Sequence, residues 1–181
     1  MIDIQKEIEK KFPNMNKKEN FLKKSLFKIA KKIVHEDSIN QFLAQNSHLK
    51  GFEFVDAVLD YFDFDYAISS NDLQNIPTSG KVVIIANHPL GGLDALCLLR
   101  LIGQIRKDVK IIANDFLAGF EALNSLIITI DNYKLKQSKS DIKKIYDALK
   151  NEEAVIIFPA GEVSRATAKG IKDPIWNKGF L

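Results

Sequence analysis

Cysteine is almost absent from this chain. Its 181 residues include one cysteine, Cys97. A single cysteine excludes a disulfide framework, and no spacing of Cys and His typical of a metal site is present. We therefore expect no structural metal and a reducing compartment. With 46% apolar and 27% charged residues, the chain has the composition of one globular α/β domain that buries its own core.

Long hydrophobic runs are also missing. The longest, residues 82–86 and 126–130, fall far short of the ~20 apolar residues needed to span a bilayer. The first residues, Met1 to Lys6, lack the basic start and apolar core of a secretory signal. The sequence therefore predicts a cytoplasmic protein whose contact with the inner face of the cell membrane is peripheral.

The net charge of +3 is too small to indicate a nucleic-acid partner, but the positive charge is concentrated in one segment. Between Lys17 and Val34 the chain has a single acid, Glu19, against seven lysines: Lys17, Lys18, Lys23, Lys24, Lys28, Lys31 and Lys32. Residues 21–34 have the period of an amphipathic helix. Three interpretations stay open: the helix lies on anionic membrane lipids, it packs on the domain with its lysines in solvent, or its lysines bind an acidic carrier protein.

The hydrophobic pattern changes near residue 64. Before it the pattern is helical, with a second helix capped by Ser38 and ending near Lys50-Gly51, and a third at Phe52–Tyr61. We interpret residues 1–63 as an N-terminal helical segment that includes the possible membrane-surface helix.

After residue 64, short β-branched runs alternate with helical stretches, notably Gly92–Ile105 and Ser140–Lys150. The expected strands are Asp65–Ser69, Lys81–Ala86, Val109–Ala113, Leu126–Ile130 and Ala154–Phe158. Such alternation predicts an α/β fold in which helices flank a mostly parallel sheet, here over residues 64–181. Ligands of these sheets bind beyond the carboxyl ends of the strands.

A polar segment follows the strand near residues 81–86: Asn87-His88-Pro89-Leu90-Gly91-Gly92-Leu93-Asp94. The proline and the two glycines predict a tight turn, which places Asp94 in the first turn of the next helix, facing back toward His88. A neutral histidine oriented by a carboxylate is suited to general-base catalysis. The segment has no serine or cysteine nucleophile, which favours direct transfer to a substrate hydroxyl or amine. The alternative is an ordinary polar turn with an acid at a helix N-terminus.

A second loop follows the strand near residues 154–158, with the sequence Phe158-Pro159-Ala160-Gly161-Glu162-Val163-Ser164-Arg165. A glycine turn followed by a hydroxyl and a guanidinium suits a phosphate or carboxylate head group. On its own, this loop is a weak signal and is more typical of a solvated turn.

Together the two segments resemble the glycerol-phosphate/lysophosphatidic-acid acyltransferase superfamily, which combines an Asn-His-(x)n-Asp block with a later Phe-Pro-x-Gly block. The expanded form Asn-His-Pro-x-Gly-Gly-x-Asp, with Phe-Pro-Ala-Gly-Glu-x-Ser-Arg, resembles its hemolysin-like or lyso-ornithine-lipid acyltransferase-like branch. The resemblance covers about residues 52–181. Family members usually continue into a further strand and a fourth block, so we expect the core to be truncated at its C-terminus.

The resemblance implies an O-acyltransferase without a metal or other cofactor, in which acyl-CoA or acyl-carrier protein donates the acyl group to the hydroxyl of a lyso-lipid. His88 would be the general base and Asp94 would orient it. Asn87, Gly161, Glu162, Ser164 and Arg165 would bind the substrate. Asn132 stands where the family usually has a phosphate-binding arginine, which disfavours glycerol-3-phosphate and favours a lyso-aminolipid or another lyso-lipid as acceptor. The same pair of residues would also serve a thioesterase or lipid hydrolase, and a non-catalytic lipid-binding module is a third possibility.

Overall fold

A computed structural model describes residues 35–113, 119–130, 138–168 and 170–177 of the chain. The chain divides into two compact units, residues 1–48 and 49–181, and each is described by itself. The predicted helix at residues 21–34 and Asn132 lie outside the described residues. No described helix has the length and apolarity needed to cross a bilayer.

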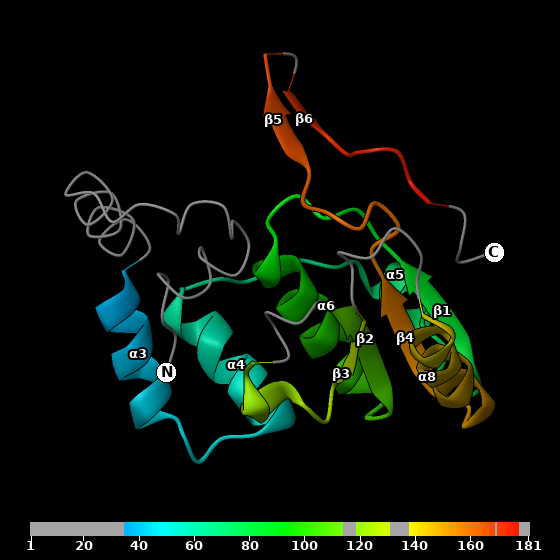
Figure 1. Cartoon of the computed structure of the whole chain (residues 1–181), viewed down its shortest axis with the longest axis horizontal. Helices are drawn as coiled ribbons and strands as arrows, with labels where there is room; N and C mark the ends of the chain where they lie inside the picture. The colour runs from blue at the N-terminus through cyan, green and yellow to red at the C-terminus, as the bar shows by residue number, and fades with distance from the viewer. Residues whose placement is uncertain (1–34, 114–118, 131–137, 169, 178–181) are drawn as a thin grey trace. The chain divides into compact units, whose positions relative to one another are not determined.

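In the first unit, the described helix α3 runs over Glu36–Gln45 and begins after His35 (Figure 1). Ser38 therefore lies inside this helix, and the prediction that it caps the helix is wrong. The helix ends where the Asn46 N–H donates to the carbonyl of Phe42. Gly51 does not end it, because Gly51 is the first residue of the next helix, α4, at Gly51–Tyr61.

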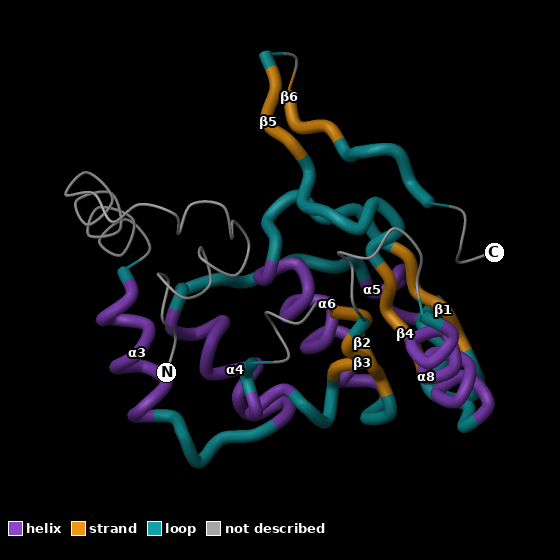
Figure 2. The backbone as a smooth tube through the Cα atoms, viewed as in Figure 1, coloured by secondary structure: helices purple, strands orange, loops and turns teal. Residues whose placement is uncertain are grey.

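The second unit is built on a sheet of four parallel strands: β1 at Val82–Ile85, β2 at Val109–Ala113, β3 at Ile127–Thr129 and β4 at Ala154–Ile157. Their order is β1-β4-β2-β3, so the last of the four strands in sequence lies between the first two (Figure 2). The predicted α/β fold with a parallel sheet and flanking helices is confirmed.

The sheet is covered by helices because its strands are apolar on both faces. Helix α8, Lys139–Lys150, packs Ala148 against Val155 of β4 and Ile128 of β3. Alternate residues of a strand point to opposite faces, and the neighbours of Val155, Ala154 and Ile156, are also fully buried. Helix α6, Gly92–Ile105, packs on β2 and on α4. Gly103 of α6 makes the contact with α4 close, since a Cβ there would lie 2.2 Å from the Phe52 ring.

The predicted strand at Asp65–Ser69 is not a strand. The segment is largely exposed, and Ser69 instead caps the short helix α5, Ser70–Gln74, by accepting a hydrogen bond from the Asp72 N–H. A short run of alternating residues needs a neighbouring strand edge, and this segment pairs with none of the described strands. Besides α5, the structure has two further features that the sequence did not predict. One is a single 3-10 turn at Glu121–Leu123, and the other is an antiparallel hairpin of β5, Arg165–Thr167, and β6, Gly170–Lys172.

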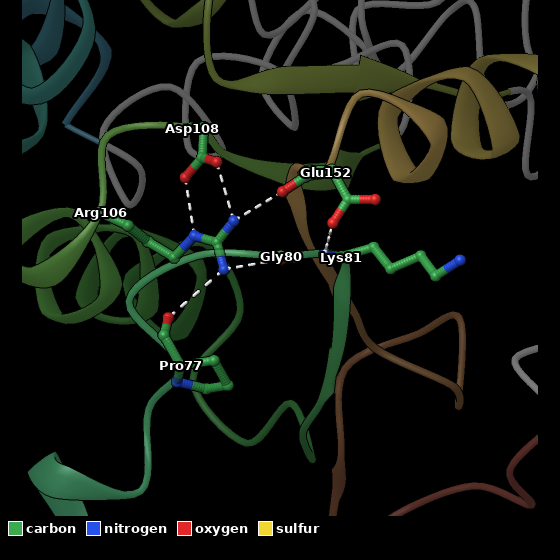
Figure 3. A network of polar contacts seen from close by, with 6 residues as sticks. All are labelled: Pro77, Gly80, Lys81, Arg106, Asp108 and Glu152. Carbon is green, nitrogen blue, oxygen red and sulfur yellow. Dashed lines mark hydrogen bonds and ion pairs between the residues drawn. The ribbon is translucent and has the colours of Figure 1, made fainter.

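The amino-terminal edge of the sheet is held by one buried guanidinium, that of Arg106 (Figure 3). Its Nε and Nη2 donate to both carboxylate oxygens of Asp108, at 2.7 and 2.8 Å. Nη1 donates to the Gly80 carbonyl at 2.8 Å and to the Pro77 carbonyl at 3.3 Å, while Nη2 also reaches the Glu152 carbonyl at 2.7 Å. Gly80, Asp108 and Glu152 lie just before β1, β2 and β4, so this one side chain links the starts of three strands.

Replacing Arg106 by lysine is expected to lower the free energy of unfolding by at least about 2 kcal/mol, because an ammonium cannot reach Asp108 and three carbonyls at once. Arg100→Lys is the matched control: Arg100 pairs with Asp56 and Asp60, which are 50% and 71% exposed. Its loss is expected to stay below about 1 kcal/mol. Denaturant unfolding of both variants measures the difference, and equal losses would contradict the proposed tie between strands.

Candidate active site

The two polar segments singled out in the sequence meet because their strands are neighbours. β1 and β4 pair in register from Val82↔Ala154 to Ile85↔Ile157, and the Ala86 N–H extends the pairing by donating to the Ile157 carbonyl at 3.2 Å. His88 follows β1 and Phe158 follows β4 at the carboxyl edge of the sheet. The two rings stack, with centroids 3.9 Å apart and planes inclined by 19°.

The predicted turn between His88 and Asp94 is present. Gly91 stands before the first residue of α6 with φ 70° and ψ −130°, a conformation open to glycine and strained for other residues. The turn brings Oδ2 of Asp94 to 2.6 Å from the Leu90 N–H, which donates to it, and to 3.3 Å from Nδ1 of His88. The side chains of His88 and Asp94 are only 17% and 15% exposed. The structure therefore brings the histidine and the carboxylate together, as the sequence predicted.

The position of Asp94 also decides which imidazole nitrogen faces a substrate. Nδ1 of His88 is buried and lies at ion-pair distance from Asp94, although it forms no hydrogen bond of standard geometry. Nε2 is therefore the nitrogen left for a substrate. Burial lowers the pKa of His88 below its ordinary value, and the nearby charge of Asp94, followed by that of Asp173, partly offsets this effect. The imidazole is consequently neutral at pH 7, the form that a general base requires.

The two glycines of the turn make a matched pair for testing this geometry. Gly91→Ala is expected to cost about 1–3 kcal/mol of unfolding free energy, because alanine is strained at its backbone angles. A Cβ at Gly92 meets nothing within 4 Å and Gly92 has no positive φ, so Gly92→Ala is expected to stay within about 1 kcal/mol of the parent. Thermal and denaturant unfolding compare the two. If Gly91→Ala were neutral, the turn would not depend on glycine.

The second loop is fastened to the first through backbone and side chains. The Gly161 N–H closes a turn by donating to the Phe158 carbonyl at 3.0 Å, and Gly161 itself has φ 70°. The Ser164 N–H then donates to the carbonyl of His88 at 2.9 Å. Ser164 therefore lies beside the histidine, and the loop after β4 supports the loop after β1.

The remaining predicted substrate-binding residues are more exposed. Nη2 of Arg165 donates to both carboxylate oxygens of Glu162 at 2.9 Å, and the two side chains are 70% and 51% exposed. Asn87 is exposed in the loop directly before His88. Glu162 bonds one terminal nitrogen of this guanidinium, so an anionic group would bind beside the carboxylate or displace it.

Asp173 is a member of the site that the sequence reasoning missed. Its Oδ1 accepts a hydrogen bond from the Ser164 hydroxyl, and its negative charge raises the pKa of His88. It lies nine residues beyond Ser164, after the unpredicted hairpin that folds the chain back. Only recognition of the hairpin from the Ala168–Gly170 region would have indicated this proximity.

The charge of Asp173 has a consequence for pH dependence. Asp173→Asn keeps an acceptor for Ser164 but removes the charge that raises the pKa of His88, so this pKa falls further. Because the neutral imidazole is the active form of a base, the acid limb of the kcat/KM profile is expected to move to lower pH. Asp147→Asn, at an exposed position of α8, is the control and should leave the limb in place. An unmoved limb in Asp173→Asn would contradict the electrostatic role.

Other reactive groups in the described part of the chain are less suited to catalysis. Cys97 lies on α6, where burial and then the charge of Asp94 raise the pKa of its thiol, which disfavours a thiolate nucleophile. Within residues 35–113, 119–130, 138–168 and 170–177, no group of three His, Cys, Asp or Glu side chains is placed to hold a metal ion.

Comparison with known proteins agrees with this geometry. A family model described as acyltransferase matches residues 7–181, and the chain belongs to this acyltransferase family. The family resemblance inferred from the two motifs is thereby confirmed.

Among individual proteins, the chain is similar to lyso-glycine lipid O-acyltransferases of Phocaeicola vulgatus and Bacteroides thetaiotaomicron. Each is 32% identical to it over 182 aligned positions, which cover the whole of this chain. The same alignments cover 63% and 65% of the two relatives, so the chain spans less than two thirds of their length. No solved structure matches the chain significantly.

Proposed function

We propose that this chain carries the catalytic centre of an O-acyltransferase that moves a fatty acyl group from a thioester to the hydroxyl of a lyso-lipid. The observation that carries the proposal is the 3.3 Å approach of a buried Asp94 carboxylate to Nδ1 of His88, at the carboxyl edge of the sheet. Membership of an acyltransferase family supports the reaction class.

In the proposed reaction, Nε2 of His88 removes the proton of the acceptor hydroxyl as its oxygen attacks the thioester carbonyl. The C–S bond then breaks, the new ester bond remains on the acceptor, and the leaving thiolate takes up the proton held by His88. Asp94 orients the ring through Nδ1 and stabilises the imidazolium that forms in between. Phe158, stacked on the ring, keeps water from one face of the imidazole.

The acceptor we propose is a lyso-aminolipid, since the relatives named for their acceptor are lyso-glycine lipid O-acyltransferases. Asn87, Gly161, Glu162, Ser164 and Arg165 would hold its head group. Arg165 suits an acidic head group, because a guanidinium binds a carboxylate through charge-assisted hydrogen bonds, as it already does with Glu162.

For the donor we propose acyl-CoA or acyl-carrier protein, both of which carry the thioester that this reaction needs. The protein would act peripherally on the inner face of the cell membrane. The lysine-rich segment 17–34, which lies outside the described residues, would bind anionic lipids there.

The test is acyl transfer from a radiolabelled thioester to lyso-glycine lipid by the full chain. His88→Ala is expected to lower kcat/KM by about 100-fold or more, because the reaction loses its base. Asp94→Asn, which keeps an acceptor for the Leu90 N–H, is expected to lower it less. His48→Ala, an exposed histidine of the other unit, is the matched control and should leave the rate unchanged.

Two outcomes would contradict the proposal. Equal activity of the parent and His88→Ala would exclude His88 as the base. Release of free fatty acid at the same rate with and without acceptor would indicate a thioesterase or lipid hydrolase that uses the same pair of residues on water.

A further inference from the structure

The β5–β6 hairpin leaves the domain at the same edge of the sheet as His88 and Asp94. Figure 1 shows it projecting away from the sheet and the helices of the second unit. All six residues of its strands are exposed. An isolated two-stranded hairpin has little stability of its own in water, so its position depends on what holds its base and on what its faces contact.

The base of the hairpin is fastened to the catalytic loop. The N–H of Ser164, just before β5, donates a hydrogen bond to the His88 carbonyl. The Ser164 hydroxyl donates a second hydrogen bond to Asp173, just after β6. Both ends of the hairpin are therefore fixed beside the histidine. Whatever binds the hairpin is held next to the reacting group.

The register of the hairpin separates its side chains into two faces. Ala166 and Ile171 lie opposite each other on one face, and Ile171 is 65% exposed. Arg165 and Lys172 form the neighbouring pair, and their side chains emerge on the other face. Glu162 already pairs with Arg165, so among the described residues Lys172 is the cation on this face that is left for an anionic partner.

Two more exposed apolar side chains lie at the base. Leu90 is 53% and Val163 44% exposed, and a Cβ on Gly91, next to Leu90, would lie 3.6 Å from Cγ2 of Val163. Both residues therefore border the turn that joins His88 to Asp94. We call Leu90, Val163 and Ile171 the apolar rim.

We propose that the apolar rim and Lys172, with Ile171 and Lys172 on the two faces of the projecting hairpin, dock the catalytic edge of the sheet on the surface of an anionic lipid bilayer. Apolar side chains beside cations are the composition of surfaces that enter the interfacial layer of membranes. Three such side chains fall well short of the roughly 800 Å² that each partner buries in a stable protein complex, which favours lipid over a protein. The inference rests on the proposed function in one respect, that the acceptor is a membrane lipid.

The test is co-sedimentation of the full chain with vesicles of phosphatidylcholine alone or with one quarter phosphatidylglycerol. Lys172→Gln is expected to weaken binding to the anionic vesicles about fivefold, the equivalent of about 1 kcal/mol for one lysine at such a surface, and to leave neutral vesicles unaffected. Ile171→Ser is expected to weaken binding to both vesicle types, because the apolar contact does not depend on lipid charge.

Matched substitutions on α8 serve as controls. Ile142, which is 43% exposed, and the exposed Lys143 are replaced as Ile142→Ser and Lys143→Gln, and both should bind vesicles like the parent. Circular dichroism and thermal unfolding of all four variants show whether each is folded. Since all four substituted side chains are exposed, the four variants are expected to unfold at the same temperature as the parent.

Unchanged binding of Ile171→Ser and Lys172→Gln would overturn the proposal and assign membrane binding to other residues, such as the lysine-rich segment. A shift from dimer to monomer in Ile171→Ser, without loss of vesicle binding, would overturn it in favour of a second copy of this chain. Failure of the proposed reaction is recognised separately: His88→Ala should lose acyl transfer and keep vesicle binding. If the parent chain transferred no acyl group but Ile171→Ser and Lys172→Gln still weakened vesicle binding, the docking surface would be supported and the proposed reaction would not.

Discussion

The site depends on the alignment of parallel strands, and that alignment is set at the opposite edge of the sheet by Arg106. Its guanidinium bonds groups just before β1, β4 and β2. With Val82, Ala154 and Val109 level at one edge, the ends of β1 and β4 are level at the other. A shift of one residue between these strands would turn each side chain to the other face and separate His88 from Phe158. Arg106 thus influences the site without touching it.

The character of His88 results from two opposed effects. Burial against Phe158 disfavours the imidazolium, while the carboxylates of Asp94 and Asp173 favour it. Burial is the larger effect, so the resting imidazole is neutral. When the ring takes up a proton during a reaction, the Asp94 carboxylate, 3.3 Å away, stabilises the imidazolium. A more exposed histidine would lack the first property, and one without Asp94 would lack the second. The exposed Arg165–Glu162 pair contributes neither property.

Local signals in the sequence predicted most of the secondary structure and the central pair of the site. Helix α6 and strand β2 have the predicted bounds, because strong periodicity and flanking turns mark them. The Pro-Gly-Gly turn correctly placed Asp94 near His88, since backbone restrictions act locally. The insertion of β4 between β1 and β2 was not predictable, because apolar parallel strands carry no local sign of their neighbours. Asp173 was missed for the same reason, and Asp65–Ser69 was assigned wrongly because short alternation does not reveal whether a strand edge is available.

The strand order has a consequence for how the protein acquires its site during synthesis. β1 and β2 are made first but do not pair, because β4, the last of the four sheet strands to be made, lies between them. Until β4 is inserted, both strands present open edges, and the histidine lacks its stacking partner. Closing a connection of this length is slow compared with local helix formation, so the site is among the last parts of the domain to assemble. A nascent chain that ends before β4 therefore lacks the ring that stacks on His88 and carries unpaired strand edges, which favour aggregation.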